Sequence, residues 1–191
     1  MPVHLVRHAC AGDKTRWAGP DLDRPLDEAG VVQASALAES FESVPVRRVL
    51  TSPAVRCRQT VEPLAQGHGV PVEALAGLLP DGEPDYLVGL IAALDAGGSG
   101  GSGASGTGAA GAARDAGAAV VCTHGETMRP LLATVRQAGG KVIAMRDDDD
   151  WLLRKGTGWE LTLNGTGTIV ALRHLVPSAM RTCSAHDPLV S

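Results

Sequence analysis

Short apolar stretches alternate with helix-like stretches through most of the chain. Residues 3–7, 47–52, 70–75 and 118–124 are rich in valine, leucine and alanine, and their hydrophobicity is nearly continuous. Such runs are typical of strands that are covered on both faces, as in a parallel sheet. We therefore predict four short strands in the interior of the molecule.

The segments between and after these strands carry apolar residues at helical spacing. Helices are expected over residues 28–42, from Ser52-Pro53 as N-cap and first position to about Ala65, around Leu87–Leu94, and around Met128–Val135. In the first of them, which Asp27 is expected to cap, the predicted apolar stripe is Val31, Ala34, Ala38 and Phe41.

Residues 158–175 alternate between apolar and polar positions around a turn that contains Gly and Asn, which predicts a hairpin. The whole order predicts one α/β domain over residues 1–177, with a mostly parallel central sheet, helices on both faces and a C-terminal hairpin. Residues 97–117 are almost wholly Gly, Ala and Ser and are interpreted as a flexible insertion. Residues 178–191 are interpreted as a disordered tail, and the acidic run 147–150 as a solvated loop.

The composition narrows the choice of partners. The 191 residues are 44% hydrophobic and carry 17 basic and 21 acidic side chains, a net charge of −4. This balance gives no reason to expect nucleic acid or a membrane as partner. The sequence shows no segment of signal-peptide or membrane-spanning length, and its four cysteines lack CxxC spacing. We therefore expect a cytoplasmic protein with free thiols; its oligomeric state stays open.

Charged residues follow three of the predicted strands. Arg7 and His8 follow the first, Arg56 lies in the first turn after the second, and His124 follows the fourth. The carboxyl ends of parallel strands share one edge of the sheet, so these four side chains should converge. Positively charged side chains that lie close together repel one another unless an anion lies among them. A phosphoryl group is such an anion, and its oxygens match the paired N–H groups of a guanidinium. The helix after His124-Gly125 would add backbone donors from Gly125, and the site requires no metal or other cofactor.

Four stretches in this order resemble the histidine phosphatase superfamily, which has the phosphoglycerate mutase-like fold. They are LVRHACAG (5–12), RPLDEAG (24–30), TSPAVRCRQT (51–60) and THGETM (123–128). The Arg-His-Ala-x-Ala form of the first is similar to the small phosphohistidine phosphatase branch. The resemblance covers residues 1–96 and 118–175. It implies that His8 is the nucleophile, that Arg7 and Arg56 hold the phosphoryl oxygens, and that His124 donates a further hydrogen bond to them.

The resemblance also implies a proton donor for the leaving group, commonly a carboxylic acid after the third strand. Asp81 is preferred by position and Glu83 is the alternative, although either would also suit a helix cap. Lys14 and Arg24 are candidate contacts to the substrate, and a purely structural role for Arg24 is equally compatible with the sequence.

These residues predict a metal-independent phosphatase that acts through a phosphohistidine on phosphoric monoesters or on protein phosphohistidine. A nucleoside-phosphate hydrolase is a substrate variant of the same hypothesis. A non-catalytic phosphate- or phosphoprotein-binding module would use the same arginines without turnover. A third alternative places the function in the 97–117 segment, as an interaction protein. A mutase is disfavoured, because residues 76–117 are short and rich in Gly and Ser where mutases build a cover over the site.

Overall fold

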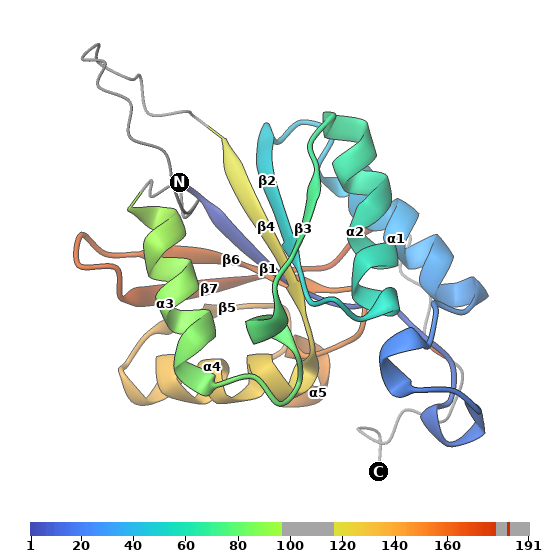
Figure 1. Ribbon diagram of the computed structural model, residues 1–191. Coiled ribbons are helices and arrows are strands. Elements are labelled where there is room, and N and C mark those ends of the chain that lie inside the picture. The colour runs from blue at the N-terminus through green and yellow to red at the C-terminus, as the bar shows by residue number, and fades with distance from the viewer. Residues whose placement is uncertain (97–116, 179–182, 184–191) are drawn as a thin grey trace.

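The four predicted strands are present and run parallel, but the third lies at the edge of the sheet and is half-buried to exposed rather than interior. The computed structural model describes residues 1–96, 117–178 and 183. The four strands, in chain order, are β1 (Val3–Arg7), β2 (Val46–Thr51), β3 (Val72–Ala74) and β4 (Ala118–Thr123). They pair in the order β3-β2-β4-β1, and every residue of β1 and β4 is buried. Parallel pairing brings the ends of β1, β2 and β4 to one edge of the sheet (Figure 1).

The predicted hairpin is confirmed and extends the sheet. Its strands β6 (Gly158–Leu163) and β7 (Ile169–Leu175) are antiparallel, and β6 also runs antiparallel to β1. A three-residue strand, β5 (Lys141–Ile143), pairs in parallel with β7 at the outer edge. The sequence pattern did not predict β5, because three residues are too few to show a period. The sheet is therefore mixed and mostly parallel, in the order β3-β2-β4-β1-β6-β7-β5.

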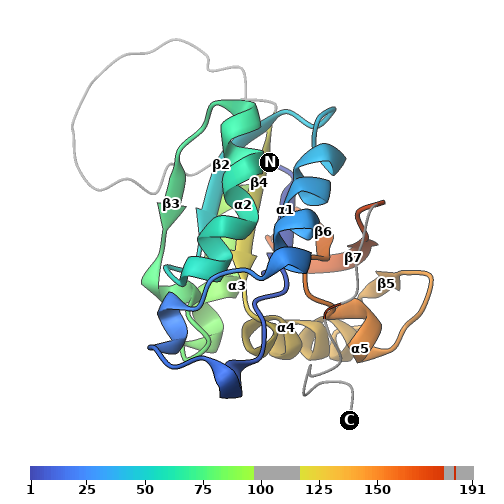
Figure 2. The same cartoon turned by 90° about the vertical axis from the view of Figure 1, so that its right-hand side faces the viewer.

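Helices cover both faces of this sheet, which confirms the predicted layers. Figures 1 and 2 show α1 and α2 on one face and α3 and α4 on the other. The α-helices are α1 (Glu28–Ser40), α2 (Val55–His68), α3 (Pro84–Asp95), α4 (Gly125–Gln137) and α5 (Asp149–Leu152). Three short 3-10 helices, η1 (Lys14–Arg16), η2 (Asp21–Asp23) and η3 (Ala76–Leu78), lie in the connections. Within the described ranges, no helix has the length and apolar character needed to cross a membrane.

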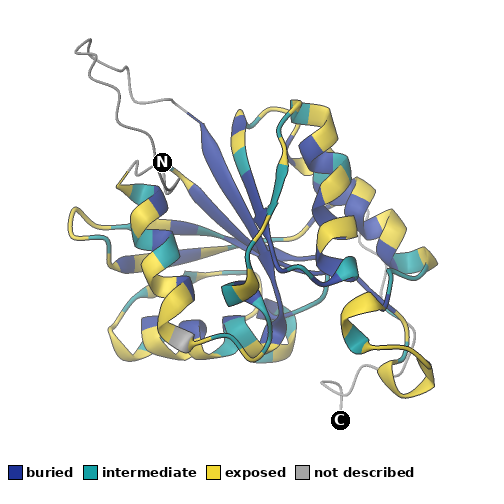
Figure 3. Cartoon of the chain, in the orientation of Figure 1, coloured by how far each residue is buried: buried dark blue, intermediate teal, exposed yellow. Residues whose placement is uncertain are grey.

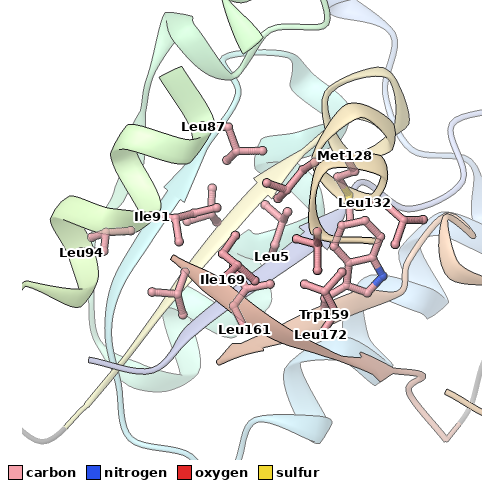
Figure 4. Packing of buried hydrophobic residues seen from close by; sticks show 14 of the residues in the cluster. Leu5, Leu87, Ile91, Leu94, Met128, Leu132, Trp159, Leu161, Ile169 and Leu172 are labelled. Atoms are coloured by element: carbon pink, nitrogen blue, oxygen red, sulfur yellow. The ribbon is translucent and has the colours of Figure 1, made fainter. Parts of the chain in front are cut away.

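Two apolar cores hold the layers together. Side chains of α1 and α2 pack with Val6, Val49 and Val120 on one face of the sheet. On the other face, leucines and Ile91 of α3 meet Met128 and Leu132 of α4 over Leu5 and the fully buried Trp159 (Figure 4). Figure 3 shows the buried strands between helices whose outer faces are exposed. Helix α3 thus confirms the predicted stripe of Leu87, Leu90, Ile91 and Leu94 only in part, because Leu90 is half-buried.

Two helix details differ from the sequence prediction. Val31 is 57% exposed, because the buried face of α1 runs instead through Gln33, Ala34 and Leu37. The second helix begins at Val55 rather than at Pro53. Ser52 does not cap it, because the N-cap position falls on Ala54, and Ser52 Oγ instead lies 2.9 Å from His124 Nε2. The predicted cap of α1 is confirmed: the Asp27 carboxylate accepts from the Gly30 amide at 2.8 Å.

The acidic run is only partly a solvated loop: Asp147 and Asp148 precede α5, which begins at Asp149, and Asp147 and Asp150 are exposed. Asp148 caps α5 by accepting from the Trp151 amide, and Asp149 pairs with Arg129 and Arg136 from α4. The predicted insertion at 97–117 lies outside the described residues except for Gly117, and the predicted tail lies outside them except for Ser178 and Cys183.

Candidate active site

The four side chains that the sequence placed at strand ends do converge. Arg7 is the last residue of β1, His8 follows it, Arg56 is the second residue of α2, and His124 is the N-cap of α4. All four are buried, with exposed fractions of 5% or less. The His8 amide donates to the carbonyl of Thr123 at 3.0 Å, which fixes the nucleophile candidate beside the end of β4.

The imidazole of His8 is oriented by its own backbone. Its Nδ1 lies 2.8 Å from the carbonyl oxygen of Ala9. A carbonyl can only accept, so Nδ1 carries the proton and Nε2 keeps its lone pair when the ring is neutral. Burial, followed by the neighbouring His124 and the charges of Arg7 and Arg56, holds the pKa of His8 well below its ordinary value of 6.5. His8 is therefore a neutral imidazole at pH 7 with a free nucleophilic nitrogen.

Buried polar side chains fix the loop that follows His8. The Ala9 amide donates to Thr60 Oγ1 at 2.9 Å, and the Cys10 amide donates to Gln33 Oε1 at 2.9 Å. A Cβ atom on Gly30 would lie 1.9 Å from the carbonyl oxygen of Cys10, so only glycine allows α1 to approach this closely. Thr60 and Gln33 were not predicted as site residues. The one feature of the sequence that could have indicated them is a polar residue at a position expected on the buried face of a helix.

Arg7 lies between two segments from the C-terminal half. Its Nη1 donates to the carbonyl of Leu153. The Gly156 amide lies 3.2 Å from the carbonyl oxygens of both Arg7 and His8. On the other side, a Cβ atom on Gly125 would lie 2.9 Å from Arg7 Cζ, so the guanidinium rests directly on the start of α4. A contact from the Gly125 amide to a phosphoryl group stays a prediction.

Arg56 and His124 contact each other. Arg56 Nη2 lies 3.4 Å from His124 Nδ1, and His124 Nε2 lies 2.9 Å from Ser52 Oγ. The rings of His124 and His8 are 5.3 Å apart between centroids. Arg56 also donates to Asp21, from Nη1 to the backbone carbonyl at 2.5 Å and from Nη2 to the carboxylate at 3.0 Å. Sequence reasoning missed both Ser52 and Asp21 as neighbours of the site.

The remaining candidates are placed less directly. Arg24 donates to Asp21 and to the carbonyls of Ala11 and Gly12, so it holds the loop after the nucleophile. The Lys14 side chain is 72% exposed and lies 3.8 Å from the Asp21 carboxylate. Contacts from either residue to a substrate stay predictions.

The two proton-donor candidates lie shortly after Leu78, whose carbonyl accepts from Thr123 Oγ1 at 2.9 Å. Asp81 and Glu83 are exposed in the connection between η3 and α3, where Glu83 is the N-cap residue without a side-chain capping bond. Neither makes a hydrogen bond or ion pair with Arg7, His8, Arg56 or His124 in the described part of the chain. Their role as proton donor stays a prediction.

Two of the four cysteines are not free, which contradicts the sequence expectation. Cys10, two residues after His8, forms a disulfide with Cys183. No local spacing pattern points to this pair, because 173 positions separate the two residues. Cys57 and Cys122 are free and buried, and Cys57 Sγ lies 3.6 Å from His124 Nε2. Over residues 1–96 and 117–178 and at Cys183, no three His, Cys, Asp or Glu side chains gather in a way that would hold a metal ion.

Comparison with known proteins agrees with this geometry. The model of the histidine phosphatase superfamily (branch 1) matches residues 3–79. The chain is 44% identical over 64 residues to an 8-oxo-(d)GTP phosphatase of Mycolicibacterium smegmatis, covering 34% of this chain and 20% of that protein. It is 34% identical over 95 residues to the phosphohistidine phosphatase SixA of Escherichia coli, covering 49% of this chain and 56% of that one. The chain thus spans from a fifth to little more than half of these relatives.

Solved structures share the fold over nearly the whole chain. The protein histidine phosphatase SixA complexed with tungstate is 20% identical, with a TM-score of 0.67, over 95% of this chain and 100% of that one. A mycobacterial glucosyl-3-phosphoglycerate phosphatase is 16% identical, with a TM-score of 0.59, over 92% of this chain and 98% of that one. Residues 3–79 thus resemble the histidine phosphatase superfamily, and the chain as a whole shares the fold of these solved phosphatases.

Proposed function

We propose that the protein is a phosphatase that transfers a phosphoryl group to His8 and then to water. The observation that carries this proposal is the state of His8. Its Nδ1 donates to the Ala9 carbonyl and its pKa is lowered, so the Nε2 lone pair is available at pH 7. Such a nitrogen is suited to nucleophilic attack on phosphorus.

The reaction follows from the groups around His8. Nε2 forms a bond to phosphorus while the bond from phosphorus to the leaving group breaks. Water then attacks the phosphorus of phospho-His8, the N–P bond breaks, and inorganic phosphate leaves. Arg7 and Arg56 would neutralise the oxygens, His124 would hold one of them, and the Gly125 amide would add a backbone donor. Asp81, or alternatively Glu83, would protonate the leaving group. This chemistry requires positioning and positive charge, which the arginines supply without a metal.

Phosphoric monoesters and protein phosphohistidine are the proposed substrates. The similarity to SixA supports a phosphohistidine protein as substrate. The 44% identity to an 8-oxo-(d)GTP phosphatase supports a nucleoside phosphate as a second candidate. A binding module without turnover is less well supported, because it would not require a nucleophilic Nε2. We expect a cytoplasmic protein, and in that compartment the Cys10–Cys183 disulfide would be a transient bond.

Release of p-nitrophenol from p-nitrophenyl phosphate in EDTA tests the proposal. We expect turnover by the wild type and none by His8→Ala. His68→Ala, which changes a half-buried histidine at the end of α2, serves as the matched control and should retain activity. Equal rates in the wild type and His8→Ala would contradict the proposal, and loss of turnover in EDTA would contradict its metal independence.

A further inference from the structure

Asp21 accepts hydrogen bonds from Arg56 with both its backbone and its side chain. The carbonyl oxygen of Asp21 accepts from Nη1 at 2.5 Å, and its carboxylate accepts from Nη2 at 3.0 Å. Asp21 belongs to η2, a short turn 35 positions before Arg56 in the sequence. One residue therefore occupies the edge of the guanidinium that its two terminal nitrogens form.

A guanidinium group has a second edge, formed by Nε and the other hydrogen of Nη2. On Arg56 this edge faces the catalytic cluster, because Nη2 also lies 3.4 Å from His124 Nδ1. Arg56 Nε is buried and has no hydrogen-bond partner among the described residues. Two parallel N–H groups of this kind match two oxygens of a phosphoryl group. With Asp21 bound to the outer edge of Arg56, Nε on the inner edge has no partner among the described residues, and Nη2 on the same edge contacts His124.

Asp21 is held in turn by other cations. Arg24 Nε donates to Oδ1 of Asp21 at 2.9 Å. Lys14 Nζ lies 3.8 Å from Oδ2, the oxygen that also accepts from Arg56. Partial burial works against ionisation, but the hydrogen bond from Arg24 and the charges of Arg56, Arg24 and Lys14 outweigh it, so the pKa of Asp21 lies below its ordinary value of 3.8. The group is a carboxylate at neutral pH. Its lowered pKa makes Asp21 poorly suited to protonate a leaving group.

We propose that Asp21 is a positioning residue. By accepting hydrogen bonds from Nη1 and Nη2 of Arg56, it holds the guanidinium so that the Nε edge faces the phosphoryl group bound at His8. The proposal rests on the proposed phosphoryl site and adds to it a residue that acts through Arg56. Arg24 links Asp21 to the carbonyls of Ala11 and Gly12. The orientation of Arg56 therefore also depends on the loop after the nucleophile.

A competing physical effect has the opposite sign. A carboxylate beside an anion site repels the anion, so its removal would strengthen anion binding if repulsion dominated. Positioning predicts weaker binding instead, because Arg56 would lose two fixed partners and would sample other rotamers. The direction of the change in oxyanion affinity therefore distinguishes the two effects.

Binding of inorganic tungstate, measured by calorimetry, tests the proposal without requiring turnover. We expect Asp21→Ala to weaken binding about 10- to 100-fold, which is the range for one hydrogen bond to a charged group. Asp21→Asn, which keeps the size of the side chain, should change affinity in the same direction. Asp23→Ala is the matched control: it removes an exposed carboxylate from the same turn, so it should leave affinity unchanged.

A double-mutant cycle identifies the route of the effect. In an Arg56→Ala background, Asp21→Ala should cause no further loss of tungstate affinity, because a positioning residue acts only through its partner. Additive losses, unchanged affinity or tighter binding in Asp21→Ala would each overturn the proposal, as would a wild type that does not bind tungstate. If the wild type binds tungstate but does not hydrolyse p-nitrophenyl phosphate, the proposed function fails. The tungstate affinities of the Asp21 variants would still decide whether Asp21 positions Arg56.

Discussion

Gly125→Ala offers a sharp test of the site, because it displaces Arg7 without changing any charge. The new Cβ atom would lie 2.9 Å from Arg7 Cζ and 3.0 Å from Arg7 Nε. Carbon atoms in ordinary contact are about 3.5–4.0 Å apart, so the guanidinium must move by about 0.6–1.1 Å. The hydrogen bond from Arg7 to the Leu153 carbonyl and the burial of the side chain limit how it can move.

The expected consequence is a loss of catalysis with little loss of stability. A misplacement of about 1 Å in a catalytic site can cost up to about 100-fold, so we predict that kcat/KM for p-nitrophenyl phosphate falls about 10- to 100-fold. This corresponds to roughly 1.4–2.7 kcal/mol of transition-state stabilisation. The thermal midpoint should not fall, because alanine is a better helix former than glycine and the clash involves a side chain.

Steady-state kinetics beside a thermal melt would give both readouts. Gly89→Ala is the matched control, because this glycine is exposed within α3 and a Cβ atom there would meet nothing within 4 Å. An unchanged kcat/KM in a folded Gly125→Ala variant would refute the reasoning. It would mean that the position of the Arg7 guanidinium does not limit the reaction.

Two further predictions concern protonation and thiols. Nitrogen-15 NMR of labelled histidine should show His8 Nε2 still unprotonated at pH 6, whereas titration of His8 near its ordinary pKa of 6.5 would contradict the lowered value. Since the unfolded chain then binds this proton before the native state does, the His8 contribution to the free energy of unfolding should be fully present above pH 6.5 and decline as the pH falls below it. Thiol titration in denaturant should detect two thiols, Cys57 and Cys122, before reduction and four afterwards. Four thiols in air-oxidised protein would contradict the Cys10–Cys183 bond.

The sequence predicted the features that depend on local pattern. The strands β1 and β4 could be found because they are short, continuous apolar runs, and the hairpin because it alternates around a turn. Arg7, His8 and His124 could be placed together because each follows a parallel strand, and topology brings such positions to one edge of the sheet. Arg56 belongs with them because it lies in the first turn of the following helix.

Features that depend on contacts between distant segments could not be predicted in the same way. Asp21 lies in a 3-10 turn without hydrophobic periodicity, so nothing in its surroundings pointed to Arg56. The Cys10–Cys183 pair has no local spacing signal for the same reason. Val31 was assigned to the wrong face because the buried face of α1 includes Gln33, whose side chain serves the Cys10 amide. In each case a tertiary partner decides the outcome.

If His8 carries the phosphoryl group during turnover, rapid quenching should trap the phosphorylated residue. The enzyme would be mixed with ³²P-labelled phosphohistidine protein or phosphate ester, quenched within milliseconds in alkali, and digested for mass spectrometry. We expect an alkali-stable, acid-labile phosphoryl group on the peptide that contains His8, and none in His8→Ala. Turnover without any phosphoryl group on this peptide, or a phosphoryl group on another residue, would contradict this expectation.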